Sequence, residues 1–139
     1  MKIVLDTNVL VSSVIATGVP HEIVVSGFNG EFEIVVSIKT LAEFRTTLLK
    51  YPERFHLSES EVQTEVETVR YFATFVEPDI HITVVDNDPD DDMFLEAAVA
   101  ADVDYLVSGD SHLLDLGSFR GVDIVEPRTF YEQLDTSEE

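Results

Sequence analysis

The sequence contains no cysteine, and only 8 of its 139 residues are Lys or Arg. The absence of cysteine excludes disulfides, iron–sulfur clusters, thiol nucleophiles and Cys-ligated zinc, so any metal site must use oxygen or imidazole ligands. No apolar run approaches the roughly 20 residues that span a membrane, and the apolar stretch at the N-terminus is too short for a signal peptide. We therefore expect a cytoplasmic protein that does not associate with membranes.

Acidic residues dominate the charge, because 28 Asp and Glu give a formal net charge of −20. Many chains this acidic are disordered, but here the acids are spread among regular apolar segments, which favours a folded protein. Spread acidity with only three lysines is typical of a surface adapted to concentrated salt, where the Debye length falls to about 3 Å at 1 M. We therefore expect a halophilic protein. The same charge argues against nucleic-acid binding through a basic patch.

Strands alternate with helices along the chain. Strands are predicted at residues 2–5, 33–37, 81–85, 105–108 and 123–125. Helices are predicted at residues 9–15, 21–28, 38–51, 93–101, 111–116 and 127–134, and from the capping box at 58–61 to about residue 76. This alternation predicts one α/β domain over residues 1–134, in which a mainly parallel sheet of about five strands has helices on both faces. The acidic tail at 135–139 is predicted to fray.

Carboxylates follow three of the predicted strands. Asp6 comes directly after the first strand, Asp110 follows the fourth strand by one glycine, and the acids of segment 88–92 follow the third. Ligands bind at the carboxyl ends of parallel strands, so these acids are expected to converge. A cation relieves the repulsion between them, and oxygen ligands favour Mg²⁺ or Mn²⁺, which activate water and stabilise the leaving oxygen of a phosphodiester.

Each of these acids also has a purely structural interpretation. Asp6 has the position of an N-cap for the helix that follows it, and Asp91 or Asp92 has the position of a cap at the next helix start. An acidic run such as 88–92 is commonly a solvated turn on so acidic a chain, and Asp110 fits a simple turn acid. Only their joint placement after strands favours a metal site.

Two segments resemble the PIN domain nucleases. Residues 3–10 (IVLDTNVL) resemble the opening motif of that family, and residues 88–98 (DPDDDMFLEAA) with 104–110 (DYLVSGD) resemble its C-terminal half. The resemblance covers nearly the whole chain and is greatest to the VapC-like ribonucleases, the toxin components of toxin–antitoxin pairs. It implies a three-layer α/β/α fold, cleavage of RNA that depends on Mg²⁺ or Mn²⁺, an antitoxin partner and commonly a homodimer.

The resemblance also carries functional residues onto this chain. Its four acidic positions fall on Asp6, Glu43, Asp91 and Asp110. Asp92, one residue beyond the third of these, could share the role of metal ligand with Asp91 or take it. Small polar groups that orient the acids in the family fall on Thr7, Asn8 and Ser108.

Glu43 is a ligand only by the resemblance. The predicted helix at 38–51 has an apolar stripe made of Ile38, Leu41, Ala42, Leu48 and Leu49. Glu43 points away from this stripe, towards Lys39 and Lys50, so helical periodicity alone predicts a solvated side chain. The four histidines, at positions 21, 56, 81 and 112, have no metal-ligand spacing and are interpreted as structural or surface residues.

Two other functions compete with a nuclease. The chain could be a catalytically weak PIN-like scaffold that acts mainly by binding a partner protein across the acidic cleft. It could also be another Mg²⁺-binding α/β domain, but a phosphotransfer receiver expects a late lysine, and no lysine follows Lys50. An aspartyl-phosphate hydrolase expects Asp-x-Asp after the first strand, where this chain has Asp6-Thr7-Asn8.

Overall fold

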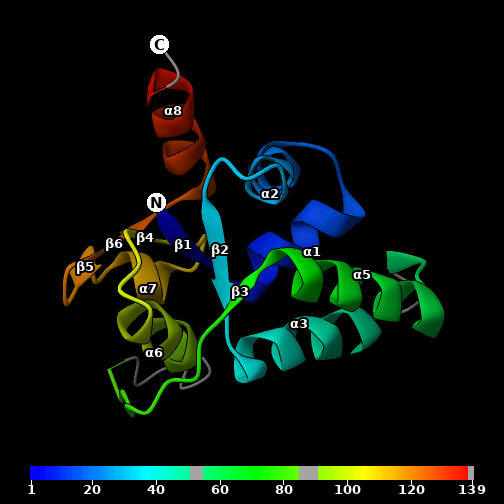
Figure 1. The fold of residues 1–139 in the computed structure, drawn as a ribbon, viewed down its shortest axis with the longest axis horizontal. Helices are drawn as coiled ribbons and strands as arrows, with labels where there is room; N and C mark the ends of the chain where they lie inside the picture. Colours follow the sequence, from blue (N-terminus) through cyan, green and yellow to red (C-terminus); the bar gives the residue numbers. More distant parts are fainter. Residues whose placement is uncertain (51–54, 85–90, 138–139) are drawn as a thin grey trace.

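One sheet lies between two groups of helices in the computed structural model, which describes residues 1–50, 55–84 and 91–137 (Figure 1). The described strands are β1 (Lys2–Leu5), β2 (Glu33–Val36), β3 (Thr74–Phe75), β4 (Tyr105–Val107), β5 (Ser118–Phe119) and β6 (Val122–Val125). The described helices are α1 (Thr7–Ile15), α2 (Val19–Phe28), α3 (Ile38–Lys50), α5 (Glu59–Phe72), α6 (Asp92–Ala100), α7 (Ser111–Leu114) and α8 (Pro127–Ser137). The predicted acids at 88–90 and the last residue of the predicted strand at 81–85 lie outside the described residues.

The strand β1 lies in the middle of the sheet, whose order is β3-β2-β1-β4-β6-β5. All neighbouring strands are parallel except β5 and β6, which are antiparallel. Leu5, the last residue of β1, pairs with Val107, the last residue of β4. The residues that follow these two strands therefore emerge side by side at one edge of the sheet. The predicted mainly parallel sheet is confirmed.

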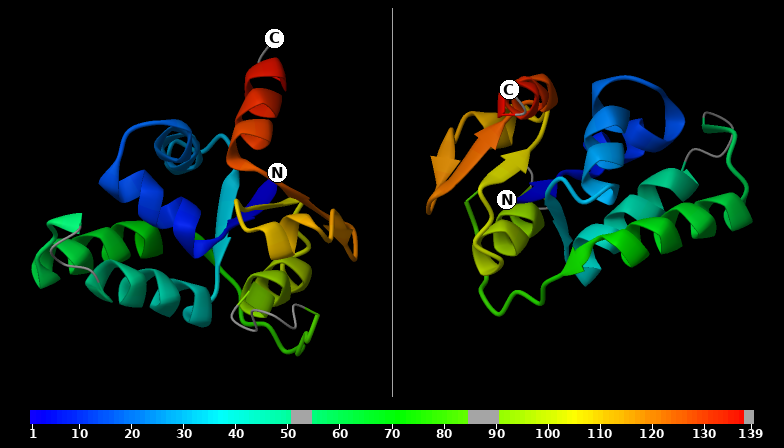
Figure 2. Two further views of the ribbon diagram at one scale, coloured as in Figure 1. Left: turned by 180° about the vertical axis from the view of Figure 1, so that it is seen from behind. Right: turned by 45° about the horizontal axis from the view of Figure 1, so that its top comes forward.

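Each face of the sheet is covered by its own helices. Ile3 and Leu5 belong to a buried cluster with side chains of α1, α2, α3, α5 and α8. Val4, between them, belongs to a second cluster that includes Leu95 of α6 and Leu113 of α7. This alternation follows from the two-residue period of a strand. Figures 1 and 2 show α6 and α7 on one side of the strands and α1, α3 and α5 on the other, which confirms the three-layer α/β/α fold.

The inward face of α3 differs from the predicted apolar stripe. Its buried residues are Thr40, Leu41, Phe44 and Leu48. Ile38 is 67% exposed, and Ala42 is exposed as well. Polar Thr40 is buried because it exchanges hydrogen bonds with Ser37 at the helix start: Ser37 N–H donates to Thr40 Oγ1 (2.8 Å) and Thr40 N–H to Ser37 Oγ (3.1 Å). The buried face is therefore rotated, and Glu43 lies half-buried at its border.

The third strand is not where the sequence predicts it. Residues 81–84 have no regular structure, although Ile82 is buried. The Ile82 N–H donates to Glu96 Oε2 (2.9 Å), and the Val84 N–H donates to Asp92 Oδ1 (3.2 Å). Side chains of α6 thus accept the hydrogen bonds that a neighbouring strand would otherwise accept. The third strand of the sheet is instead β3, a two-residue strand close behind α5, which ends earlier than predicted.

Two C-terminal features also differ from prediction. A sixth strand, β5, forms a hairpin with β6 around the turn Arg120–Gly121. Both turn residues have positive φ, 49° and 85°, as a type I′ turn requires. The helix α8 continues to Ser137, three residues past the predicted end.

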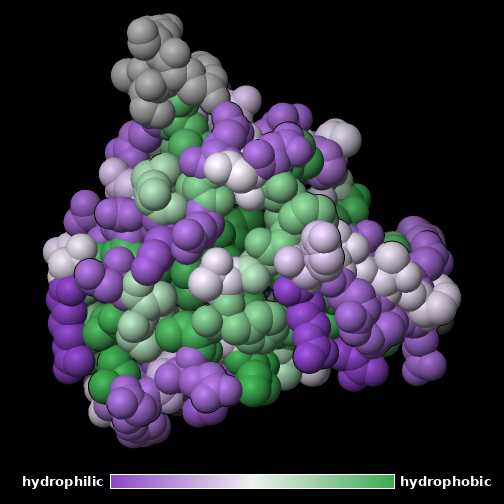
Figure 3. All heavy atoms as spheres, viewed as in Figure 1, coloured by the Kyte–Doolittle hydropathy of each residue, from purple (hydrophilic) through white to green (hydrophobic). Residues whose placement is uncertain are grey.

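The face in Figure 3 has hydrophobic side chains over its middle, around β3 and the start of α3, and hydrophilic side chains around them. A groove of about 340 Å³ lies between α3 and α5, and its lining includes Ile38, Phe75, Arg45 and Arg70. Ile38 and Phe75 are two of the large apolar side chains that solvent reaches. Among the described residues, no single helix is long and apolar enough to cross a membrane, and α1 and α2 pass that test only as a pair bent by 96°.

Candidate functional site

Asp6 follows β1 and begins α1. Its N–H donates to Val107 O (3.0 Å), which continues the pairing of β1 with β4. Its Oδ1 accepts from Val9 N–H (2.9 Å), so Asp6 is the N-cap of α1, as the structural interpretation expects. This capping bond leaves Oδ2 to face the end of β4. The side chain is only 4% exposed.

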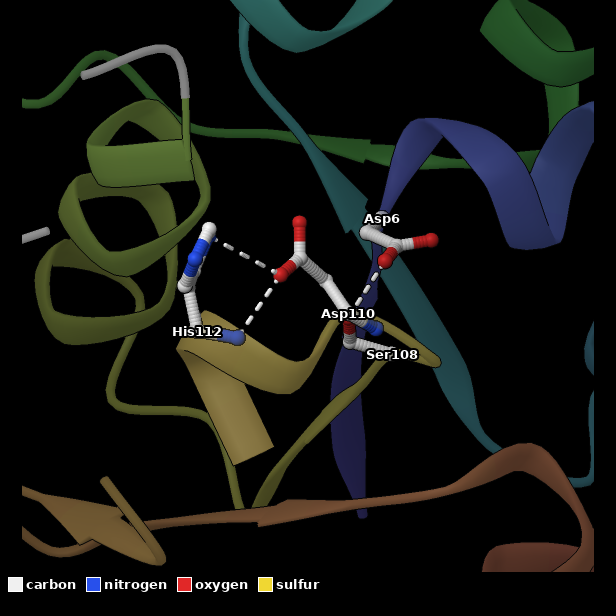
Figure 4. A network of polar contacts seen from close by, with 4 residues as sticks. All are labelled: Asp6, Ser108, Asp110 and His112. Atoms are coloured by element: carbon white, nitrogen blue, oxygen red, sulfur yellow. Dashed lines mark hydrogen bonds and ion pairs between the residues drawn. The ribbon is translucent and has the colours of Figure 1, made fainter. Parts of the chain in front are cut away.

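Ser108 links Asp6 to Asp110. The Ser108 hydroxyl donates to Asp6 Oδ2 and accepts from Asp110 N–H (2.9 Å). Asp110 caps α7, because its Oδ1 accepts from His112 N–H (2.8 Å). Figure 4 shows these contacts at the ends of β1 and β4. Because the two strands end side by side, one polar chain holds two carboxylates at the same edge of the sheet.

Glu43 and Asp91 reach the same place from helices. Asp91 directly precedes α6 and is 7% exposed, and Glu43 lies in α3. Together with Asp6 and Asp110 they line one cavity of about 120 Å³. The other residues that line it are Thr7, Asn8, Thr47 and Phe94. The prediction that three strand ends deliver the acids is wrong for Asp91, because no strand leads into α6 from residues 81–84.

Asp92 lies next to Asp91 in the sequence but does not line this cavity. Its Oδ1 accepts the backbone N–H of Val84 (3.2 Å), so it holds the segment before α6 against the helix start. The structure therefore brings Asp91, and not Asp92, into the cavity with Asp6, Glu43 and Asp110. Thr7 and Asn8 line the cavity, whereas Ser108 acts through its hydrogen bonds to Asp6 and Asp110.

Burial raises the pKa of Asp6 above its ordinary value, because the ionised carboxyl loses its hydration. The hydrogen bond from the Ser108 hydroxyl and the Val9 N–H oppose this rise, and the charge of Asp110 adds to it. A cation in the cavity would favour the ionised form of Asp6. The electrostatics of the site are thus those of a position that positive charge stabilises.

The lining of the cavity fits a hard divalent cation. It presents carboxylate oxygens and the buried Thr7 hydroxyl, whose Oγ1 has no hydrogen-bond partner among the described residues. Ligand atoms of Asp91, Asp110 and His112 all lie within 4.8 Å of one another. Ligands of an octahedral Mg²⁺ are about 3.0 Å apart when adjacent and about 4.2 Å apart when opposite, so a shared ion would draw these atoms closer together. The volume is sufficient for an ion and a few waters at about 30 Å³ each.

His112 is the site residue that the sequence analysis missed. Its Nδ1 lies 3.6 Å from Asp110 Oδ1. The available signal was its position two residues after Asp110 at a helix start. Two other histidines fit the structural interpretation, since His21 Nδ1 contacts Ser13 O (3.0 Å) and His81 Nδ1 lies 3.3 Å from Glu96 Oε2.

Comparisons with known proteins agree with this arrangement. A family model described as "PIN domain" matches residues 2–112, a range that contains all four acids of the cavity. A chain in the crystal structure of VapBC2 from Rickettsia felis, bound to a DNA fragment from their promoter, is similar in fold. It shares 12% identity with a TM-score of 0.62, and the match covers 89% of this chain and 97% of that one. No curated protein matches the sequence.

Proposed function

This chain belongs to the PIN domain family, and from that membership and its acidic cavity we propose that it is a divalent-metal-dependent ribonuclease that hydrolyses phosphodiester bonds in RNA. The observation that carries the proposal is the convergence of Asp6, Glu43, Asp91 and Asp110 on one cavity of about 120 Å³. Carboxylates in such proximity repel one another, and a bound cation relieves that repulsion. Their positions also coincide with the acids that the family resemblance implies.

In this proposal the four acids hold Mg²⁺ or Mn²⁺. When bound, such an ion supplies an activated water and neutralises the charge that develops on the phosphate and the leaving oxygen. Ser108 keeps Asp6 and Asp110 in their relative positions through its two hydrogen bonds. Thr7 and Asn8 border the cavity and orient what binds there. None of these roles requires a side-chain nucleophile.

The net charge of −20 opposes RNA binding, because it repels the phosphates of the substrate. Concentrated salt reduces long-range repulsion, because the Debye length is only about 3 Å at 1 M. The proposed ion supplies positive charge at the one place where a phosphate must approach. We therefore expect activity to require both the divalent ion and a high salt concentration.

The direct test is cleavage of a mixed RNA pool in molar KCl with Mn²⁺, Mg²⁺ or EDTA. We expect the wild-type protein to cut RNA with either ion and not with EDTA. Asp6→Asn, purified in the same way, is expected to be inactive, with a loss of at least about 100-fold. Equal cleavage by the variant would show that the activity belongs to a contaminant or another site. Absence of cleavage by folded wild-type protein without a bound partner would reject the nuclease.

We also propose that the chain is the toxin of a toxin–antitoxin pair. The resemblance to VapC-like toxins supports this role, as does the fold shared with a chain of the VapBC2 crystal structure. An antitoxin protein is then the expected partner, and a homodimer is the expected assembly. Two expression experiments test the pair. Co-expression with the product of a small neighbouring reading frame supports it if the two proteins form a stable complex that does not cut RNA. Expression of the chain alone contradicts it if the growth of the host cells is unaffected.

The groove between α3 and α5 favours one alternative, a scaffold that acts mainly by binding a partner protein. Solvent-exposed Ile38 and Phe75 line it beside Arg45 and Arg70. Such an apolar surface with cations at its sides is suited to an acidic amphipathic segment. A scaffold and a nuclease differ in one result. Ile38→Glu would abolish the function of a scaffold by weakening partner binding, whereas it would leave the RNA cleavage of a free nuclease unchanged.

A further inference from the structure

The imidazole of His112 lies beside the carboxylates of the cavity. Its Nδ1 is 3.6 Å from Asp110 Oδ1, and its candidate ligand atom lies within 4.8 Å of those of both Asp91 and Asp110. Figure 4 shows the ring next to the Asp110 carboxylate, with Asp6 on the far side of that group. Because α6 and α7 both begin here, three potential ligands meet from two helix starts.

The backbone fixes the position of this histidine. Its N–H donates to Asp110 Oδ1 (2.8 Å), which holds residue 112 within the first turn of α7. The side chain is 44% exposed, so an ion pair with Asp110 alone would contribute little to stability. A surface pair therefore gives no strong reason for the ring to lie beside both Asp91 and Asp110. The buried Thr7 hydroxyl, which has no hydrogen-bond partner among the described residues, independently indicates that the same cavity accepts a ligand.

We propose that His112 donates an imidazole nitrogen to the ion that Asp91 and Asp110 hold, and that this nitrogen makes the site prefer Mn²⁺ to Mg²⁺. The chemistry follows from ligand preference. Mg²⁺ binds oxygen almost exclusively and keeps much of its water, whereas transition-metal ions bind imidazole more readily. The inference rests on the proposed function only in assigning the ion to the same cavity; it does not depend on the substrate.

The test uses Mn²⁺ as a spectroscopic probe in the full chain labelled with ¹⁵N-histidine. Pulsed electron paramagnetic resonance of bound Mn²⁺ is expected to detect a nitrogen coupling that changes with the label. In His112→Asn this coupling is expected to vanish. Calorimetric titration is expected to give about tenfold weaker Mn²⁺ binding and about twofold or less change for Mg²⁺. Thermal unfolding of the variant confirms that it is folded.

The matched control is His56→Asn. His56 is exposed and has a φ of 55°, a conformation that asparagine tolerates, so the nitrogen coupling should persist. Mn²⁺ that binds without a nitrogen coupling, or a coupling that survives His112→Asn, overturns the role of His112 and leaves the proposed nuclease intact. A coupling in a protein that does not cut RNA supports His112 and rejects the nuclease. No binding of Mn²⁺ at millimolar concentration rejects both.

Discussion

Asp6→Asn is expected to stabilise the metal-free protein while it removes activity. Asp6 is 4% exposed, and burial raises the pKa of its carboxyl. Asparagine has nearly the same shape, and its Oδ1 can still accept from Val9 N–H, so the N-cap of α1 is preserved. Its amide can donate to Ser108 Oγ, which then serves as acceptor in place of donor. The substitution therefore removes a desolvated charge at little cost in packing.

The sign of the pH dependence follows from the raised pKa of Asp6. The folded protein binds this proton more tightly than the unfolded chain, so the contribution of Asp6 to stability is fully present at acid pH, below the pKa of the unfolded chain. It is lost as the pH rises through the interval up to the raised folded-state pKa. At neutral pH the ionised carboxylate thus lowers the stability of the metal-free protein. The asparagine variant does not lose stability over this interval.

The expected magnitudes are measurable. Each unit of raised pKa corresponds to about 1.4 kcal/mol, and for a chain of this length about 1 kcal/mol changes Tm by roughly 3–4 °C. We therefore expect the variant to melt a few degrees higher than the wild type at pH 7 in EDTA. Mn²⁺ at about 100 times its Kd should stabilise the wild type by about 2.7 kcal/mol, or close to 10 °C, and should not stabilise the variant.

The assay is thermal unfolding in molar KCl from pH 4 to pH 8, with EDTA or Mn²⁺. Asp123→Asn provides the control, because it removes the same charge from an exposed residue. Asp123 lies near the start of β6, at the end of that strand away from the cavity. It should change Tm little and should keep the response to Mn²⁺. The reasoning about charge at this position is refuted if Asp6→Asn melts below the wild type in EDTA. It is also refuted if Mn²⁺ stabilises the variant as much as it stabilises the wild type.

Three further substitutions test individual contacts by urea unfolding. Ser108→Ala removes the donor to Asp6 and the acceptor for a backbone amide, and should cost about 1–3 kcal/mol; an unchanged midpoint would contradict the polar chain. Gly27→Ala places a Cβ only 2.6 Å from Cδ1 of buried Ile34 and should cost about 1–3 kcal/mol; a stabilised variant would contradict this packing. Glu96→Ala leaves a buried amide without its acceptor and should cost about 1–3 kcal/mol; a neutral effect would mean that the segment before α6 is held otherwise.

Much of the fold could be predicted from the sequence because the central strands are apolar. β1, β2 and β4 have strong apolar patterns, and α1 and α5 begin at side-chain N-caps. The capping box forms as predicted, with Glu61 N–H donating to Ser58 Oγ (3.1 Å) and Ser58 N–H donating to Glu61 Oε1 (3.2 Å). Local signals of this kind depend on few neighbours, so they can be recognised in the sequence.

The remaining features depend on contacts between distant residues. β3 and β5 are two residues long, too short to show alternation, and they exist because a neighbouring strand pairs with them. Residues 81–84 have the apolar content of a strand. They do not form one, and side chains of α6 accept the hydrogen bonds from two of their backbone amides. The predicted apolar stripe of α3 placed Glu43 in solvent, whereas the residue is half-buried. The prediction failed because the buried face of the helix includes polar Thr40. His112 lies near Asp110 in the sequence, but its proximity to Asp91 depends on the packing of α7 and α6 into one cluster.

The adjacent acids at the start of α6 allow a decisive comparison. Asp91 lines the cavity, whereas Asp92 accepts the Val84 N–H, a bond that asparagine can keep. We would measure metal-dependent RNA cleavage by Asp91→Asn and Asp92→Asn at equal concentration of folded protein. A loss of at least about 100-fold for Asp91→Asn, with near-wild-type cleavage by Asp92→Asn, would establish the cavity as the active site. The reverse order, or equal cleavage by both variants, would contradict it.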